Sequence, residues 1–174
     1  MGFEDRFITE KQVLAINCKR IRKRKNKLQT DISVSTNLRA TRLSAIENAK
    51  SNVEFATLHK LKSGLQTNIN FLFEDPTSPL DEITFTPTEL DVEKMNFSNR
   101  LLQLMLHLNV TQRDLSIMIS MGEGEISSLV NGHHNVELIT IVKIALALKT
   151  TIPIMFMYNS YLPNKKGYKQ ELIY

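Results

Sequence analysis

Apolar residues recur three and four positions apart along much of the chain, which is the spacing of one face of an α-helix. The pattern is clearest in residues 101–108, 115–119, 126–129 and 138–148. Their apolar positions are Leu101, Leu104, Met105 and Leu108, then Leu115, Met118 and Ile119, then Ile126 and Leu129, then Leu138, Ile141, Ile144, Ala145 and Leu148. No alternation of apolar and polar residues is sustained over a useful length. The pattern predicts an all-α protein in which these residues are buried.

The same pattern occurs twice in the chain. A shift of 83 positions aligns residues 18–73 with residues 101–156 without a gap, and about a quarter of the aligned residues are identical. The identical pairs include Asn26/Asn109, Gln29/Gln112, Asp31/Asp114, Ser33/Ser116, Asn48/Asn131, Asn52/Asn135, Val53/Val136 and Glu54/Glu137. Two copies are too few for a solenoid, which needs about three or more repeats to bury its faces. We therefore expect two small domains of one fold, each built from five short helices.

A segment with three prolines, Pro76, Pro79 and Pro87, separates the two copies. Because proline removes a hydrogen-bond donor and disfavours helix in the preceding residue, residues 75–85 are predicted to be a linker. Thr86-Pro87-Thr88-Glu89 has the form of a capping box and predicts a short helix over about 87–95. The predicted organisation is a first domain at 1–74, a linker with this helix at 75–96, a second domain at 97–157 and a tail at 158–174 that suits a strand or a docking arm.

Local signals mark the ends of two helices in the second copy. Thr111 can cap a helix whose third residue is Asp114. Asn131-Gly132 can end the next helix, because glycine readily adopts the left-handed conformation. The first copy lacks this glycine, since Ala49 stands at the position of Gly132. In the first copy Leu28 replaces the capping Thr111.

Composition places the chain among soluble globular proteins. Of its 174 residues, 42% are apolar and 23% are charged, so a packed core is expected. No apolar run is long enough for a transmembrane helix, and residues 1–11 do not resemble a secretory signal. Cys18 has no second cysteine to pair with, and the four histidines are scattered, so no disulfide, metal or cofactor is predicted. We expect a cytoplasmic protein that contacts no membrane.

The charge is concentrated in the first part of the chain. Residues 1–75 carry 14 Lys and Arg against 8 Asp and Glu, whereas residues 76–174 carry 8 against 10. Seven of the ten residues from Cys18 to Lys27 are basic. They are Lys19, Arg20, Arg22, Lys23, Arg24, Lys25 and Lys27. Such a run attracts a polyanion, most simply nucleic acid, unless it is only a solvated helix face.

The motif Thr111-Gln112-x-x-Leu115-Ser116, followed by Ile126-Ser127 and Asn131-Gly132, resembles the Cro/repressor type of helix-turn-helix domain. The first copy matches it at Gln29, Ile32-Ser33, Leu43-Ser44, Ile46-Glu47 and Asn48. The resemblance implies two tandem five-helix, lambda-repressor-like domains. In this family the second helix lies against the phosphate backbone, and the third helix enters the major groove.

The resemblance also implies which residues contact DNA. In the first copy Leu38, Leu43 and Ile46 form the buried face of the recognition helix, and its outer face reads bases. The expected DNA-binding residues are Gln29, Thr30, Arg39, Ala40, Thr41, Arg42, Ser44, Ala45, Asn48 and Lys50, with Gln112, Ser127 and Asn131 in the second copy. Each has a plainer interpretation as an exposed polar residue, a helix stop or half of a surface ion pair.

The two copies are not equivalent. Family members pair an arginine in the first helix with a glutamate at the end of the third, and the first copy has both, as Arg22 and Glu47. The second copy has Met105 and Val130 instead. Because a buried charge without its partner is costly, the loss of both together indicates a structural ion pair, and we expect Arg22 to be structural and not a DNA contact. The groove-facing residues change from Arg39-Ala40-Thr41-Arg42 to Gly122-Glu123-Gly124-Glu125. We therefore expect the first copy to read DNA, and the second to be a degenerate reader, a dimerisation domain or a partner-binding domain.

The sequence gives no support for an enzyme. Gly122-x-Gly124 lacks a third glycine and a preceding strand, so it does not predict a dinucleotide-binding loop. The expected function is a sequence-specific regulator of transcription that binds double-stranded DNA as a homodimer near the nucleoid, most simply a repressor. The alternatives are an antitoxin that also represses its own operon, and an adaptor that uses the fold to bind a protein partner through its second copy.

Overall fold

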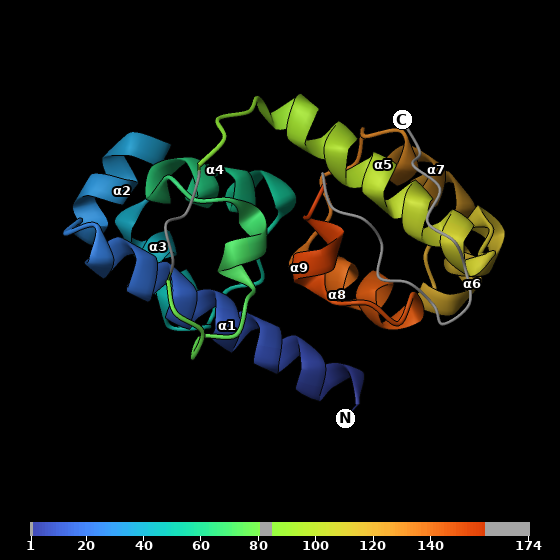
Figure 1. Cartoon of the computed structure of the whole chain (residues 1–174), viewed down its shortest axis with the longest axis horizontal. Helices are drawn as coiled ribbons and strands as arrows, with labels where there is room; N and C mark the ends of the chain where they lie inside the picture. Colours follow the sequence, from blue (N-terminus) through green and yellow to red (C-terminus); the bar gives the residue numbers. More distant parts are fainter. Residues whose placement is uncertain (1, 81–84, 159–174) are drawn as a thin grey trace.

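The computed structural model describes residues 2–80 and 85–158, and in these ranges the regular elements are helices (Figure 1). The first copy runs from α1 to η1 and the second from α5 to α9. Their bounds are α1 Phe3–Arg24, α2 Gln29–Thr36, α3 Ala40–Glu47, α4 Phe55–Leu65, the 3₁₀ helix η1 Ile69–Leu72, α5 Leu90–Leu108, α6 Gln112–Ile119, α7 Glu123–Val130, α8 Leu138–Ala147 and α9 Ile152–Met155. The all-α prediction is confirmed. The predicted tail beyond Tyr158 and residues 81–84 of the predicted linker lie outside the described residues.

The helices repeat at the same offset of 83 residues as the sequence. α6 and α7 begin and end at the counterparts of the residues that begin and end α2 and α3. The described residues with positive φ form four pairs at this offset: Asn26/Asn109, Asn37/Ser120, Ala49/Gly132 and Gln66/Lys149. Each pair occupies the left-handed turn after a helix, where the chain must change direction. The two copies therefore share one backbone plan.

Side chains that are identical in the two copies stabilise this plan locally. A serine hydroxyl spans the turn between the second and third helices of each copy, and an asparagine amide binds a carbonyl at the end of the third helix. The bonds are Ser33 Oγ to the Leu38 carbonyl and Ser116 Oγ to the Met121 carbonyl, both 2.6 Å, and Asn48 Nδ2 to the Ser44 carbonyl and Asn131 Nδ2 to the Ser127 carbonyl, both 2.8 Å. These bonds satisfy backbone acceptors that would otherwise be left without partners at helix ends.

The predicted helix ends of the second copy are confirmed. The Asp114 amide donates to Thr111 Oγ1 at 3.1 Å, and the Thr111 amide donates to Asp114 Oδ2 at 2.9 Å, which completes a capping box. Gly132 has a φ of 75° after the end of α7. In the first copy Leu28 provides no side-chain cap, but its amide donates to Asp31 Oδ2 at 2.6 Å, so half of the box remains.

The start of the second copy differs from the prediction. Instead of a short helix over 87–95 followed by another, α5 is one helix of 19 residues that begins at Leu90 with Glu89 as its N-cap. The capping box at Thr86 does not form, because the Thr86 amide donates to Asn68 Oδ1 at 3.3 Å. Thr88 is drawn into a buried contact instead, since its hydroxyl accepts from Lys62 Nζ at 2.7 Å. Tertiary partners therefore override the local signal.

The prediction that Met118 is buried is wrong. Its side chain is 55% exposed, whereas Leu115 and Ile119 on the same helix are buried. Because α6 is only two turns long, its contact with the core is a narrow stripe that Met118 borders without entering. The other predicted core residues of α6, α7 and α8 are buried.

The two copies share one hydrophobic core. The rings of Phe55 from α4, Phe97 from α5 and Phe156 after α9 lie with their centroids 5.0 to 5.7 Å apart. α1 of the first copy packs on α8 of the second, α5 packs on α4, and η1 packs on α9. One cluster of buried apolar residues runs through both copies. The boundaries predicted for two domains stay a prediction, but between the copies there is a packed interface.

Candidate nucleic-acid interface

The outer face of α3 is open to solvent, and its inner face is locked in the core. Leu43 and Ile46 are each 1% exposed, and they fix the orientation of the helix. Ala40, Thr41 and Arg42 are exposed in its first turn. The remaining predicted contact residues of this helix are its N-cap Arg39, which is exposed, and Ser44 and Ala45, which are half-buried. The structure therefore brings the predicted base-reading residues together on one surface.

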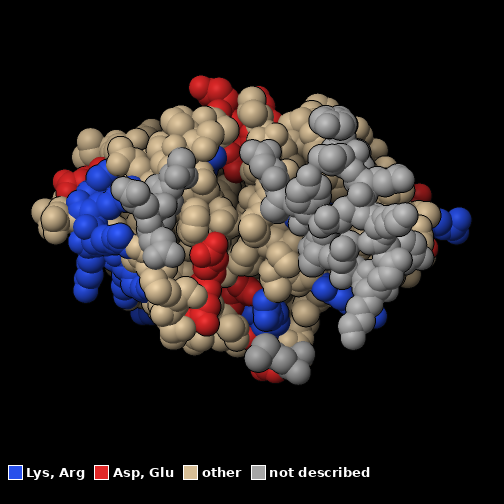
Figure 2. Space-filling view, viewed as in Figure 1, with Lys and Arg blue, Asp and Glu red and all other residues tan. Residues whose placement is uncertain are grey.

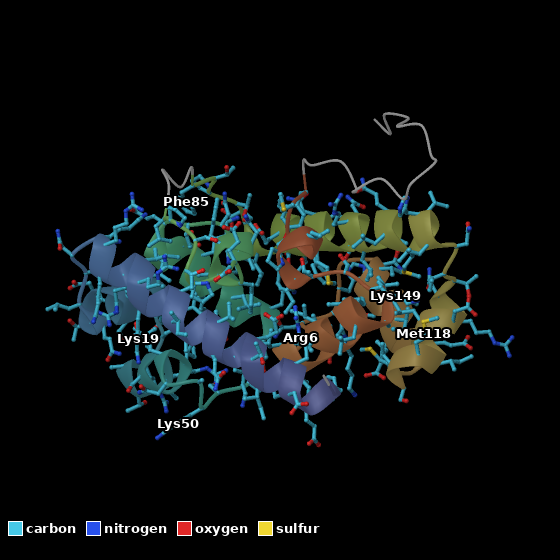
Figure 3. All side chains as sticks on the ribbon, turned by 60° about the horizontal axis from the view of Figure 1, so that its bottom comes forward. Arg6, Lys19, Lys50, Phe85, Met118 and Lys149 are labelled. Atoms are coloured by element: carbon cyan, nitrogen blue, oxygen red, sulfur yellow. The ribbon has the colours of Figure 1, made fainter. Side chains whose placement is uncertain are left out.

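A hydrogen bond joins the end of α3 to α1. Lys19 Nζ donates to Asn48 Oδ1 at 3.2 Å. Asn48 is the C-cap of α3, and Lys50 follows it as an exposed residue. Figure 3 shows Lys19 and Lys50 at the same end of the molecule, far from Met118 and Lys149. The bond thus places Lys19 of the basic run beside the C-terminal end of α3.

Several cations of the basic run have partners within the protein. Arg20 donates to the Ser78 carbonyl at 2.7 Å, Lys25 to the Gln66 carbonyl at 2.7 Å and Lys27 to the Gly64 carbonyl at 3.1 Å. Lys23 and Arg24 are exposed. Burial lowers the pKa of Lys25, and the neighbouring charges of Lys27 and Arg24 lower it further. The bonds to carbonyls keep these charges near the surface, so Lys and Arg gather over α2 and the end of α1 (Figure 2).

Arg22 is a structural residue, as its pairing in the sequence predicted. Its Nε and Nη2 donate to Glu47 Oε1 and Oε2 at 2.6 and 2.8 Å, and its Nη1 donates to the Lys27 carbonyl at 3.0 Å. The Glu47 side chain is 1% exposed. Burial alone raises the pKa of Glu47, but the hydrogen bonds from Arg22 and Gln29 and the charge of Arg22 outweigh it, so the pKa is lowered. In the second copy the counterparts Met105 and Val130 are both buried.

Gln29 has an internal role beside the predicted one. Its Nε2 donates to Glu47 Oε2 at 2.7 Å, so the amide helps to hold the buried carboxylate. Gln29 is half-buried, and the bond to Glu47 leaves one of the two N–H donors of its amide for a phosphate. Thr30 beside it is exposed. In the second copy, where Val130 replaces Glu47, Gln112 is exposed.

The corresponding face of α7 is acidic. Gly122 is the N-cap, and its amide donates to Glu125 Oε2 at 3.0 Å. Glu123 lies 3.9 Å from Arg113 on α6. Carboxylates in a first helical turn favour the helix, because they face its positive end. The remaining predicted contact residues, Ser127 and Asn131, are exposed.

The charge difference extends beyond the third helix. Six cations of the first copy that lie in α1, in α3 or next to α3 in the sequence are exposed or half-buried, namely Lys19, Lys23, Arg24, Arg39, Arg42 and Lys50. At an offset of 83 residues their counterparts are Leu102, Leu106, His107, Gly122, Glu125 and His133. None of these counterparts is a Lys or an Arg. A polyanion that approaches both copies therefore meets attraction at one and a carboxylate at the other.

Sequence reasoning missed an exposed apolar surface on the second copy. Leu106 and Ile117 are each 70% exposed, and Leu102 is 39% exposed. The second copy also has a groove of about 570 Å³, lined by Phe3, Met118, Ile119, Ser120, Lys143, Leu146 and Ala147. The signal was present in the alignment of the copies, because Leu102 and Leu106 stand where the first copy has Lys19 and Lys23.

Three other features bear on function, namely metal-binding groups, membrane-spanning helices and a reactive cysteine. The described residues contain no group of three or more His, Cys, Asp or Glu side chains placed to hold a metal ion. No helix in the described ranges has the length and hydropathy needed to cross a bilayer. Cys18 is fully buried, and burial raises the pKa of its thiol. No protein-family model matches the chain, and neither a curated protein nor a solved structure matches it.

Proposed function

We propose that the protein is a sequence-specific regulator of transcription that binds double-stranded DNA through the first copy. The two copies are then tandem helix-turn-helix domains of the Cro/repressor type, and α3 is the recognition helix. The observation that carries the proposal is the exposed, cation-lined face of α3, joined to the basic end of α1 by the Lys19–Asn48 hydrogen bond. The resemblance in sequence favours repression by occupation of a promoter.

Two kinds of contact contribute to the proposed binding energy, namely contacts to phosphates and contacts to base edges. Lys23, Arg24 and Lys50 attract phosphates and give an affinity that falls with salt but does not depend on sequence. Arg39 and Arg42 at the start of α3 bind the acceptors of guanine or a phosphate, and the methyl groups of Ala40 and Thr41 pack against thymine. This order along α3 matches a helix that enters the major groove by its amino end.

The test is selection of a random duplex pool by the purified protein, followed by sequencing. The Arg39→Ala/Arg42→Ala variant removes two cations from the face of α3. The matched control, Arg113→Ala/Lys149→Ala, removes two exposed cations from the second copy. We expect an enriched motif that the control keeps and the first variant loses. A motif that survives the first variant and is lost with the control would move the reader to the second copy, and no enrichment at low salt would reject the proposal.

A protein partner on the second copy is a second candidate function. The exposed apolar residues Leu106 and Ile117 favour it, because exposed apolar side chains suit a protein partner. An antitoxin or an adaptor of this fold would use such a surface. If a protein co-purifies with the chain, Leu106→Asp/Ile117→Asp should release it without changing the selected DNA motif. Retention of the partner by this variant would place its binding site elsewhere.

A further inference from the structure

The two copies contact each other through bonds that repeat reciprocally. The Phe55 amide donates to the Val136 carbonyl at 2.8 Å, and the Leu138 amide donates to the Val53 carbonyl at 2.7 Å. Phe55 and Val53 of the first copy are the counterparts of Leu138 and Val136 in the second, so each bond is the other with the copies exchanged. Together they form the isolated antiparallel bridge between Glu54 and Glu137.

The side chains around this bridge repeat in the same way. Asn52 Nδ2 donates to Glu137 Oε2 at 2.8 Å, and Asn135 Nδ2 donates to Glu54 Oε2 at 2.9 Å. The Ala56 amide donates to Asn135 Oδ1 at 2.9 Å, and the amide of its counterpart Ile139 donates to Asn52 Oδ1 at 3.3 Å. Asn52, Glu54 and their counterparts are therefore identical in the two copies at the point where the copies meet.

Because each bond has an equivalent with the two copies exchanged, a rotation of about 180° superimposes one copy on the other at this interface. In Figure 1 a half-turn about the viewing direction carries α1 towards α5 and α4 towards α8. The packing agrees, because the contact of α1 with α8 becomes the contact of α5 with α4. A half-turn leaves every point at its height along the axis. The helices α3 and α7 therefore lie at equal height along this axis, as the equivalent helices of a symmetric dimer do.

The interface is buried as deeply as a domain core. Phe55 and Phe97 from different copies are each 1% exposed, and their rings meet at 5.3 Å. Lys62 of α4 forms a buried ion pair with Glu93 of α5. Separation of the copies would expose both apolar rings to water, which is unfavourable. The paired arrangement is thus the stable one.

We propose that one chain is a fused pair that occupies a DNA site as a monomer, with α3 over one half-site and α7 over its neighbour. This inference rests on the proposed function for its DNA part. The pairing that a single-copy relative would achieve by homodimerisation is supplied here within the chain. The two half-sites are unequal, because six surface cations of the first copy have no Lys or Arg counterpart in the second. The site is therefore asymmetric and differs from the palindrome expected for a homodimer.

Two measurements test the proposal. The first is the mass of the free chain and of its complex with a selected duplex, by sedimentation and native mass spectrometry. We expect a free monomer and a complex of one chain with one duplex whose motif is not palindromic. A free dimer, or two chains on a palindrome, would overturn the proposal.

The second measurement tests the internal pairing without DNA. In an antiparallel bridge of this type, the paired Cα atoms lie about 4.5 Å apart, which suits a disulfide. Glu54→Cys/Glu137→Cys should therefore oxidise to a monomer with an internal crosslink, and Glu54→Cys alone should not. Crosslinked dimers from the double variant, or no crosslink, would reject the pairing. Because this result does not depend on DNA, it separates failure of the pairing from failure of the proposed function.

Discussion

Arg22 and Glu47 form a doubly hydrogen-bonded ion pair in the first copy, with N–O distances of 2.6 and 2.8 Å, and both members are replaced by apolar residues in the second. The Glu47 side chain is almost completely buried. The same two positions are therefore filled by an ion pair in the first copy and by the apolar residues Met105 and Val130 in the second. This allows the value of the ion pair to be measured against a natural alternative in the same molecule.

Breaking the pair and replacing it should have different effects. Arg22→Met leaves Glu47 buried without its arginine, and such a loss costs about 3–5 kcal/mol. Arg22→Met/Glu47→Val copies the second copy's residues, and we expect it to recover most of that loss. Urea unfolding of the two variants and the parent protein measures the difference. If the double variant were less stable than the single one, the apolar pair would not be an adequate replacement.

The same pair should make stability depend on pH in acid. The folded-state pKa of Glu47 lies below its ordinary value of 4.5, so the folded protein gains stability from this group above that pH. That stability is lost as the pH falls through the lower, folded-state pKa. Burial raises the pKa of Glu10 and outweighs the charge of Arg6, so Glu10 affects the pH dependence of stability in the opposite direction to Glu47. Because Glu10 is present in both proteins, its effect cancels in the comparison.

The free energy of unfolding should therefore decrease more steeply below pH 4.5 in the parent protein than in Arg22→Met/Glu47→Val. Denaturant titrations at several pH values between neutrality and acid measure both curves. Parallel curves would show that Glu47 does not contribute to the acid sensitivity of the fold.

Two glycines should respond to alanine in opposite ways. A Cβ at Gly124, in the first turn of α7, would meet no atom within 4 Å, so Gly124→Ala should stabilise the protein by about 0.5–1 kcal/mol. A Cβ at Gly64 would lie 2.3 Å from Thr36 Cγ2, so Gly64→Ala should destabilise it by about 1–3 kcal/mol. Thermal unfolding checks both signs. Equal effects of the two substitutions would contradict the packing described around α4.

The shared core should make both copies unfold together. Phe97→Ala removes a ring that touches Phe55 and Phe156, and the loss should be about 3–5 kcal/mol. Hydrogen exchange should then show the amides of α2 and α6 losing protection by a similar factor. Ile117→Ala, at a residue that is 70% exposed, is the control and should change stability by less than about 0.5 kcal/mol. Loss of protection in α6 alone would mean that the copies are independent.

The sequence predicted the helices best where their signals are local. Thr111 and Asp114 cap α6 through bonds within one turn, and Gly132 ends α7 through its own backbone freedom, so neighbouring residues suffice to predict both. The role of Arg22 was predictable for a different reason, because the repeat provides a second copy in which the pair is lost together. The exposed surface of α3 also agrees with its pattern of apolar positions.

What the sequence did not predict depends on contacts between distant segments. The helix predicted to begin at Pro87 begins instead at Leu90, and the hydroxyl of Thr88 accepts from Lys62, which is 26 residues away. The identity of Asn52 with Asn135 shows that the copies are related but not that each asparagine binds the other copy. Periodicity alone indicates neither contact. The exposure of Leu106 was missed for a different reason: a leucine on a helix is ordinarily interpreted as part of the core, although the alignment places this one at the position of Lys23.

The most direct test of the central claim is the salt dependence of affinity for a selected duplex. Lys23→Ala/Lys50→Ala removes two exposed cations from the first copy, and Arg113→Ala/Lys149→Ala removes two exposed cations from the second copy. If the first copy holds the phosphates, the slope of log K against log salt should decrease in magnitude by about 2 in the first variant. In the second variant the slope should decrease by less, because its two cations lie on the copy whose third helix begins with carboxylates. Equal slopes in the first variant and the parent protein would contradict DNA binding through the first copy.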